Sequence, residues 1–166
     1  MSETNNHVSN SYLTFKLGEE EFGIHVNQVV NILEMSRIVD VPKTPEYMKG
    51  VINLRGKALP VIDTRLKFAM PEKEHTSNTC IIVLDLDSNG SPLNIGAIVD
   101  EVTSVIEIEK NQIEPPPNLG NKYQSDFIYG MAKIDERFVM LLDMQRVISP
   151  EVLENLSKNA GESIPV

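Results

Sequence analysis

Three histidines and a single cysteine are among the side chains of this sequence that could hold a metal ion or act as a nucleophile. The histidines are His7, His25 and His75, and none has a partner at the spacing of metal ligands, because HExxH and CxxC do not occur. Cys80 opens the apolar run CIIVL, where a packed, unreactive thiol is the simpler interpretation. We therefore expect no metal site, and for Cys80 a structural role.

Four aspartates offer the other possible chemistry, since paired carboxylates can share a proton and act as acid and base. Asp63, Asp85, Asp100 and Asp143 each end an apolar run. Capping a helix or forming a turn explains an aspartate in such a place more simply than a catalytic pair does. The sequence also contains no phosphate-binding loop and no dinucleotide fingerprint. We therefore expect a protein that is not an enzyme and binds no cofactor.

The composition excludes several further classes of protein. The chain has 166 residues, 41% of them hydrophobic, which is enough for a core of its own. No apolar run approaches the roughly 20 residues of a membrane span, and the polar start MSETNNHVSN lacks the regions of a signal peptide. One cysteine rules out an internal disulfide framework, which favours the cytoplasm. The net charge of −9 argues against binding to nucleic acid.

The elements that must position these residues come in two similar sets, because the second half of the chain repeats the pattern of the first. Residues 23–44 match residues 96–117 at a constant offset, and residues 50–68 match residues 130–148 at a slightly larger one. Two similar modules in a small chain create a cleft between them, and we expect function there. Matched pairs include Gly23 and Gly96, Val29 and Val102, Gly50 and Gly130, and Asp63 and Asp143.

Most of the predicted elements are strands. Alternating apolar residues predict strands over residues 11–17 and 21–26, and residues 37–41 also have a strand pattern. The apolar run at residues 79–87 predicts a strand that is buried on both faces. Residues 94–108 can form one long bent strand or two. A hairpin is expected across Arg55-Gly56.

Two segments predict helical structure. Val26, Val29, Val30 and Leu33 fall at helical spacing, which indicates a short helical turn. Residues 150–158 are the best candidate for a helix, because Pro150 suits its first position.

Residues 50–68, GVINLRGKALPVIDTRLKF, carry the most specific motif of the chain. Together with residues 12–15, 23–24, 41–42 and 96–107, they resemble the CheW family of chemotaxis coupling proteins. The resemblance covers residues 11–148. The regulatory domain of the histidine kinase CheA and the N-terminal domain of CheV are similar to this family too. This chain has no phosphotransfer, ATP-binding or receiver region, so it resembles the standalone coupling protein.

The resemblance implies a mainly β fold of two SH3-like five-stranded β-barrel subdomains, with short helices and a C-terminal helix. The expected CheW-like domain is residues 11–148, with a first barrel at about 11–70 and a second at about 78–148, and exchange of strands between them is left open. Residues 1–10 are expected to be a disordered tail, and residues 149–166 the C-terminal helix and tail. The loop at residues 118–126 has no assigned role.

The resemblance also implies a non-enzymatic scaffold that links methyl-accepting chemotaxis receptors to CheA. Such a protein is cytoplasmic and is recruited to membrane-associated receptor arrays without inserting into the membrane. The groove between the barrels would take the helical hairpin tip of a receptor, and other surfaces would bind the kinase regulatory domain. Two other interpretations stay open. One is a paralogous coupling protein for another pathway, such as pilus motility. The other is a small ligand-binding barrel or enzyme with paired ionisable groups in the cleft.

The site residues that the resemblance implies form two sets. Plain structural roles compete with them: core packing for the valines, a solvated turn charge for Arg55, and a bulge with positive φ for Gly50. Asn31 departs from the family, which often has Glu there. A charged residue at Gly50 is expected to weaken kinase binding more than receptor binding. The receptor-facing set is Val29, Asn31, Arg55, Cys80, Val102 and Val105, and the kinase-facing set is Ile38, Val39 and Gly50.

Overall fold

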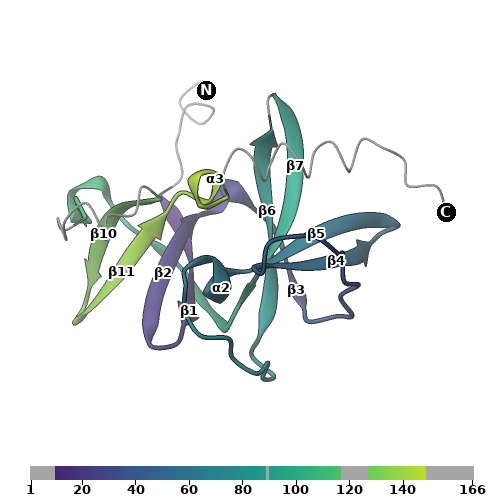
Figure 1. Ribbon diagram of the computed structural model, residues 1–166. Helices are drawn as coiled ribbons and strands as arrows, with labels where there is room; N and C mark the ends of the chain where they lie inside the picture. The colour runs from purple at the N-terminus through teal and green to yellow at the C-terminus, as the bar shows by residue number, and fades with distance from the viewer. Residues whose placement is uncertain (1–9, 89, 117–126, 149–166) are drawn as a thin grey trace.

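The computed structural model describes residues 10–88, 90–116 and 127–148, and in them the chain forms two β-sheets that pack against each other (Figure 1). The mainly β fold with two subdomains is confirmed. The six-stranded sheet has the order β8-β1-β2-β11-β10-β9, and the five-stranded sheet has the order β3-β6-β7-β5-β4. The six-stranded sheet consists of β1 (Ser11–Leu17), β2 (Glu20–His25), β8 (Glu101–Glu107), β9 (Ile113–Glu114), β10 (Ile128–Ile134) and β11 (Arg137–Leu142). The five-stranded sheet consists of β3 (Val29–Glu34), β4 (Met48–Leu54), β5 (Lys57–Asp63), β6 (Cys80–Ser88) and β7 (Ser91–Val99).

Each sheet takes strands from both halves of the sequence. The first half places β1 and β2 in the six-stranded sheet and β3, β4 and β5 in the other. The second half does the reverse, because β6 and β7 join the five-stranded sheet while β8, β10 and β11 join the six-stranded one. The boundary between residues 70 and 78 therefore separates the two sequence repeats and does not separate the two sheets.

The repeat in the sequence corresponds to a repeat in the structure. When the strands of one half are replaced by their counterparts in the other, β3-β6-β7-β5-β4 becomes β8-β1-β2-β11-β10. Each sheet contains one parallel pair, β5 with β7 and β11 with β2. The β-bulges also lie at corresponding positions. Val30 in β3 and Thr103 in β8 are the extra residues of one pair of bulges, and Lys49 in β4 and Tyr129 in β10 are those of the other pair.

Three clusters of buried side chains explain why some strands are apolar on both faces. A central core between the sheets includes Phe15 of β1, Ile24 of β2 and Ile82 of β6. One smaller core belongs to the five-stranded sheet and another to the six-stranded sheet. In β6, Ile82 faces the central core whereas Ile81 and Val83 face the smaller one, which confirms the prediction for this strand.

Short helical turns follow or precede the strands. Asp63 caps α2 (Thr64–Lys67) and Asp143 caps α3 (Met144–Val147), as the sequence predicted. The 3₁₀ turns are η1 (Val26–Gln28) and η2 (Lys110–Gln112). The helix candidate at residues 150–158 lies outside the described residues.

One local prediction was confirmed and another was wrong. The short helical turn expected from the spacing of Val26, Val29, Val30 and Leu33 is η1, and β3 follows it at Val29 and pairs with β6. Residues 37–41 form no strand, although Val39 makes a single bridge to Val51 of β4. Where two strands or one bent strand were expected at residues 94–108, Asp100 separates β7 from β8.

Candidate functional site

Two equivalent edge strands, β3 and β8, carry four of the six residues predicted to face a receptor. Each is the outermost strand of its sheet. The six residues from Val29 and the six from Val102 have the same order of half-buried and exposed positions. Val105 is 59% exposed, while Val30 and Ile32 of β3 are 55% and 42% exposed. Exposed β-branched side chains on an edge strand provide apolar surface that a partner can cover.

The remaining apolar members lie deeper. Val29, Cys80 and Val102 are half-buried and pack against the central core, so both edge strands begin at the surface of that core. Burial raises the pKa of the Cys80 thiol, which a hydrogen bond with the backbone of Val102 opposes in part. The thiol is therefore protonated at neutral pH, and its contact with Val102 joins the start of β6 to the start of β8.

Asn31 lies on β3 with an exposed side chain. Its Oδ1 accepts a hydrogen bond from the backbone N–H of Ile32 at 2.8 Å. This local bond holds the amide against its own strand, and the position carries no charge where the family often has one.

Arg55 lies away from the other members of its set. It occupies the tip of the β4–β5 hairpin with φ of 53°, followed by Gly56 with φ of 83°. The Gly56 N–H donates to Oδ1 of Asn53 at 2.8 Å, which fixes the turn. β4 and β3 are the two outer strands of the five-stranded sheet, so the structure does not bring Arg55 next to the valines. Within the described residues, no ion pair involves its exposed guanidinium.

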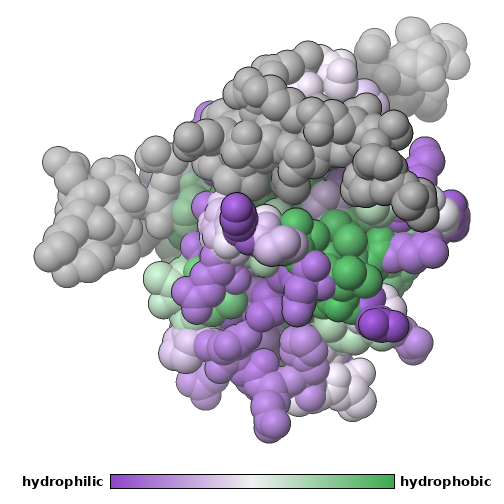
Figure 2. All heavy atoms as spheres, turned by 45° about the vertical axis from the view of Figure 1, so that its right-hand side comes forward, coloured by the Kyte–Doolittle hydropathy of each residue, from purple (hydrophilic) through white to green (hydrophobic). Residues whose placement is uncertain are grey.

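The three residues predicted to face the kinase lie close together. Val39 exchanges backbone hydrogen bonds with Val51 at 2.8 and 2.9 Å, which brings it beside Gly50. Gly50 has φ of 142°, and a Cβ at this position would overlap the backbone oxygen of Val39 and lie 2.9 Å from Cγ2 of Ile38. Val39 itself is 54% exposed. Figure 2 brings the β4–β5 side of the molecule forward and shows apolar surface gathered there beside polar side chains.

Because Gly50 contacts the backbone of Val39, a substitution at Gly50 does not test kinase binding alone. Any side chain must displace the backbone of residue 39, and positive φ adds strain of its own. A charged residue at Gly50 therefore disturbs the fold as well as the surface, so Val39 is the better residue to change.

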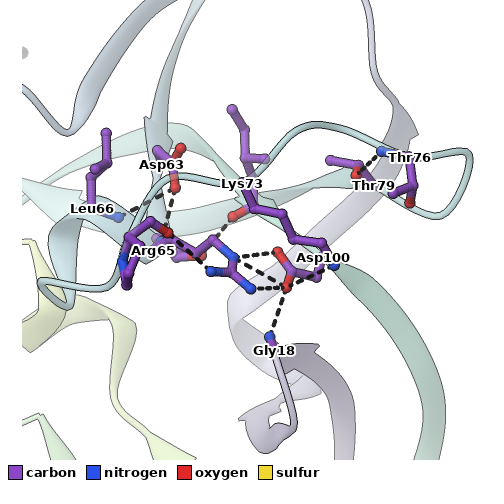
Figure 3. A network of polar contacts seen from close by, with 11 residues as sticks. Gly18, Asp63, Arg65, Leu66, Lys73, Thr76, Thr79 and Asp100 are labelled. Carbon is purple, nitrogen blue, oxygen red and sulfur yellow. Dashed lines mark hydrogen bonds and ion pairs between the residues drawn. The ribbon is translucent and has the colours of Figure 1, made fainter.

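A polar network joins α2 and the β1–β2 turn to Asp100, which lies between β7 and β8 (Figure 3). Nε and Nη2 of Arg65, in α2, donate to the carboxylate of Asp100 at 2.9 and 2.7 Å. The backbone N–H of Gly18, in the β1–β2 turn, donates to the same carboxylate at 2.7 Å. The side chains of Arg65 and Asp100 are only 12% and 13% exposed. All of these bonds join one segment of the protein to another. The ion pair therefore has a structural role, which is to link α2 and the β1–β2 turn to the start of β8.

Sequence reasoning missed several of these residues. Val30 and Ile32 alternate as in a strand, but the helical reading of the segment concealed this signal. Asp100 was interpreted as a residue that ends an apolar run, and Arg65 was given no role. No local pattern could have paired them, because they are far apart in the sequence and meet only through the exchange of strands.

Two further classes of site were searched for in the part of the chain that the structure describes. There, no three His, Cys, Asp or Glu side chains are grouped so that they could hold a metal ion. Within residues 10–88, 90–116 and 127–148, none of the helices has the length and apolar character of a membrane span. The arrangement described above is suited to contacts with other proteins.

Comparisons with known proteins identify the family of this chain. The family model of the CheW-like domain matches residues 11–152. The chemotaxis protein CheW of Klebsiella aerogenes is 32% identical over 155 residues, which cover 92% of this chain and 91% of that protein. The chemotaxis protein CheW of Bacillus subtilis is 33% identical over 139 residues, covering 84% and 86%. The crystal structure of the scaffolding protein TtCheW from Thermoanaerobacter tengcongensis aligns with a TM-score of 0.75 and 32% identity, over 86% of this chain and 94% of that one.

Proposed function

The chain belongs to the CheW-like family, and on that premise we propose that it is a coupling protein that links chemoreceptors to the histidine kinase CheA. The family match over residues 11–152 is the observation that carries this proposal. The protein acts as a non-catalytic scaffold: it binds two partners and holds them together. It reaches membrane-associated receptor arrays by binding receptors and does not enter the bilayer.

The receptor surface consists of the exposed apolar strips of β3 and β8. Val30, Ile32 and Val105 are exposed, and the strands begin on the same central core. A helical hairpin that covers these residues would gain about 1.5–3 kcal/mol for each side chain that it buries fully. Arg55 would bind a carboxylate of the receptor from the hairpin tip, since its guanidinium is exposed.

The kinase surface consists of Ile38, Val39 and the backbone at Gly50. Its support is the close packing of these three residues and the 54% exposure of Val39. The bridge between Val39 and Val51 holds the exposed side chain on a rigid backbone. A rigid apolar anchor loses little conformational entropy when a partner covers it.

Calorimetric titration with the isolated regulatory domain of a CheA kinase from the same cell tests the proposal. We expect saturable one-to-one binding in the micromolar range, as is common for transient signalling interfaces. Folded protein that binds neither this domain nor a receptor tip would overturn the proposal.

Two variants serve as controls for each other. Val39→Asp should abolish kinase binding and leave receptor binding within about twofold, because it changes one side chain on one surface. Val105→Asp should do the reverse. Both side chains are more than half exposed, so neither change should unfold the protein. If both variants lose both partners, the two surfaces are not separate.

A further inference from the structure

We propose that the Arg65–Asp100 ion pair is a positioning element for the receptor surface: it fixes where β8 starts and thereby where Val102 and Val105 lie. The inference rests on the proposed function for its binding consequence. Its structural half, the placement of β8 relative to β3, stands on the contacts alone.

Asp100 occupies the point where the chain leaves one sheet for the other. It is the single residue between β7 of the five-stranded sheet and β8 of the six-stranded sheet. Its backbone N–H donates to the carbonyl oxygen of Lys16 in β1 at 3.1 Å. Its carboxylate accepts from Gly18 in the β1–β2 turn and from Arg65 in α2, which follows β5. One residue is therefore bound by segments of both sheets (Figure 3).

Arg65 is itself held in place. Its Nη1 donates to the carbonyl oxygen of Pro71 at 3.0 Å, and its backbone N–H donates to the capping carboxylate of Asp63 at 2.9 Å. A guanidinium that is fixed at both ends presents two donors to one carboxylate in a single orientation. The ion pair therefore transmits the position of α2 to the start of β8.

The charges in the network favour each other. Burial alone would raise the pKa of Asp100, but the hydrogen bonds from Arg65 and Gly18 and the nearby charge of Lys73, 3.7 Å away, lower it overall. The hydrogen bond to Asp100 raises the pKa of Arg65. Both side chains are charged at neutral pH, as the positioning role requires.

The start of β3, the other strand of the receptor surface, is held by a contact that corresponds to the Arg65–Asp100 ion pair but is made by a neutral side chain. β3 starts after η1, and Gln28 of η1 donates from Nε2 to Oδ1 of Asp143 at 3.2 Å. Oε1 of Gln28 accepts from the backbone N–H of Met144 at 3.3 Å. The chain crosses between the sheets once before β3 and once before β8. The crossing before β3 is bonded through the amide of Gln28 to α3, and the crossing before β8 is bonded through the ion pair to α2. Loss of a buried charged partner disturbs its surroundings more than loss of a neutral one.

Binding measurements on the full chain provide the first test. Arg65→Gln and Asp100→Asn should weaken binding of a receptor-tip fragment roughly tenfold, within the range seen for residues that act at a distance. Binding of the kinase regulatory domain should change less than about twofold. The matched control is Glu72→Gln, because Glu72 forms an exposed ion pair with Lys49 at 2.9 Å that lies outside β3, β8 and the crossings between the sheets. It should leave both affinities unchanged.

Distance measurement provides a readout that a general loss of stability would not move. Spin labels at Asn31 and Ser104, which are exposed and equivalent in the two repeats, report the separation of β3 and β8 in a Cys80→Ala background. Arg65→Gln and Asp100→Asn should broaden or shift the distance distribution, while Glu72→Gln should not. The exchanged pair Arg65→Asp with Asp100→Arg should restore part of the wild-type distribution.

The outcomes separate the two proposals. An unchanged distribution in folded Arg65→Gln and Asp100→Asn, with receptor affinity also unchanged, would overturn the positioning role. If the wild-type protein does not bind receptor tips at all, the proposed function fails, and the distance distributions still decide whether the ion pair positions β8.

Discussion

At the scale of single residues, the carboxylate of Asp100 links stability to pH. Its pKa in the folded protein lies below the ordinary value of an aspartate, because the hydrogen bonds from Arg65 and Gly18 outweigh the effect of burial. A carboxyl with a lowered folded pKa stabilises the fold fully at pH values above its unfolded pKa. This contribution is lost as the pH falls through the folded pKa.

Asp100→Asn should therefore lower the free energy of unfolding at pH 7 by about 2–3 kcal/mol, since it leaves the charge of Arg65 largely buried and without its partner. The difference from the wild type should shrink below about pH 4, where the wild-type carboxyl also becomes protonated. Urea unfolding at pH 7 and pH 3 measures both effects. Glu72→Gln is the control: it removes an exposed pair with Lys49 and should change stability by less than about 0.5 kcal/mol. An equal loss at both pH values would contradict the linkage.

Arg55 supports a second prediction at this scale. Its side chain is exposed at a hairpin tip, so Arg55→Ala should leave the free energy of unfolding within about 0.5 kcal/mol of the wild type. Receptor binding should weaken by roughly tenfold if the guanidinium pairs with a receptor carboxylate. Thermal unfolding and calorimetry on the same sample separate the two effects. A severe drop in melting temperature would show that the arginine is structural.

Residue roles that depend on local chemistry could be predicted from the sequence. Asp63 and Asp143 cap helical turns, as their place after a strand indicated. Positive φ at Gly50 was one of the two roles considered for it, and the structure adds the reason, which is the backbone of Val39. The partner of Asp100 could not be predicted, because it depends on which sheet each strand joins.

At the scale of elements, the structure of residues 29–34 determines which side chains belong to the receptor surface. The spacing of its valines fits a helix as well as a strand, and the pairing with β6 selects the strand. This pairing exposes Val30 and Ile32, while Val29 stays half-buried against the central core. Tertiary pairing thus overrides a local pattern that allows two structures.

The exposed positions of β3 lead to a prediction for the whole strand. Val30→Thr combined with Ile32→Thr keeps β-branched side chains and should leave stability within about 1 kcal/mol of the wild type. It removes apolar contact area, so binding of a receptor tip should weaken about tenfold or more. Val41→Thr is the control, since Val41 is 36% exposed and lies outside β3. Wild-type affinity in the double variant would exclude β3 from the receptor surface.

At the scale of the whole molecule, the two repeats share one core. The central cluster contains side chains from both sheets, and each sheet contains strands from both repeats. The sequence showed the repeat, but an alternating pattern indicates only that a strand has a buried face. It does not indicate which strand lies beside it, so the exchange of strands could not be predicted.

The shared core predicts that neither half folds alone. Fragments cut between residues 77 and 78 would each expose half of the central core and leave both sheets incomplete. Each fragment should lack the near-ultraviolet circular dichroism of the full chain, and an equimolar mixture should recover most of it. The intact chain should unfold in one cooperative transition. A folded, monomeric fragment of 78–166 would contradict this prediction.

Strand exchange also determines when the six-stranded sheet can form during synthesis of the chain. β1 and β2 leave the ribosome first, but the strands that flank them, β8 and β11, emerge much later. At about 5–20 residues per second, the β1–β2 hairpin waits on the order of ten seconds for these neighbours. During that time the apolar face that carries Phe15 and Leu17 is uncovered, although both side chains are fully buried in the finished protein. This hairpin is therefore the segment that a chaperone at the ribosome would meet first.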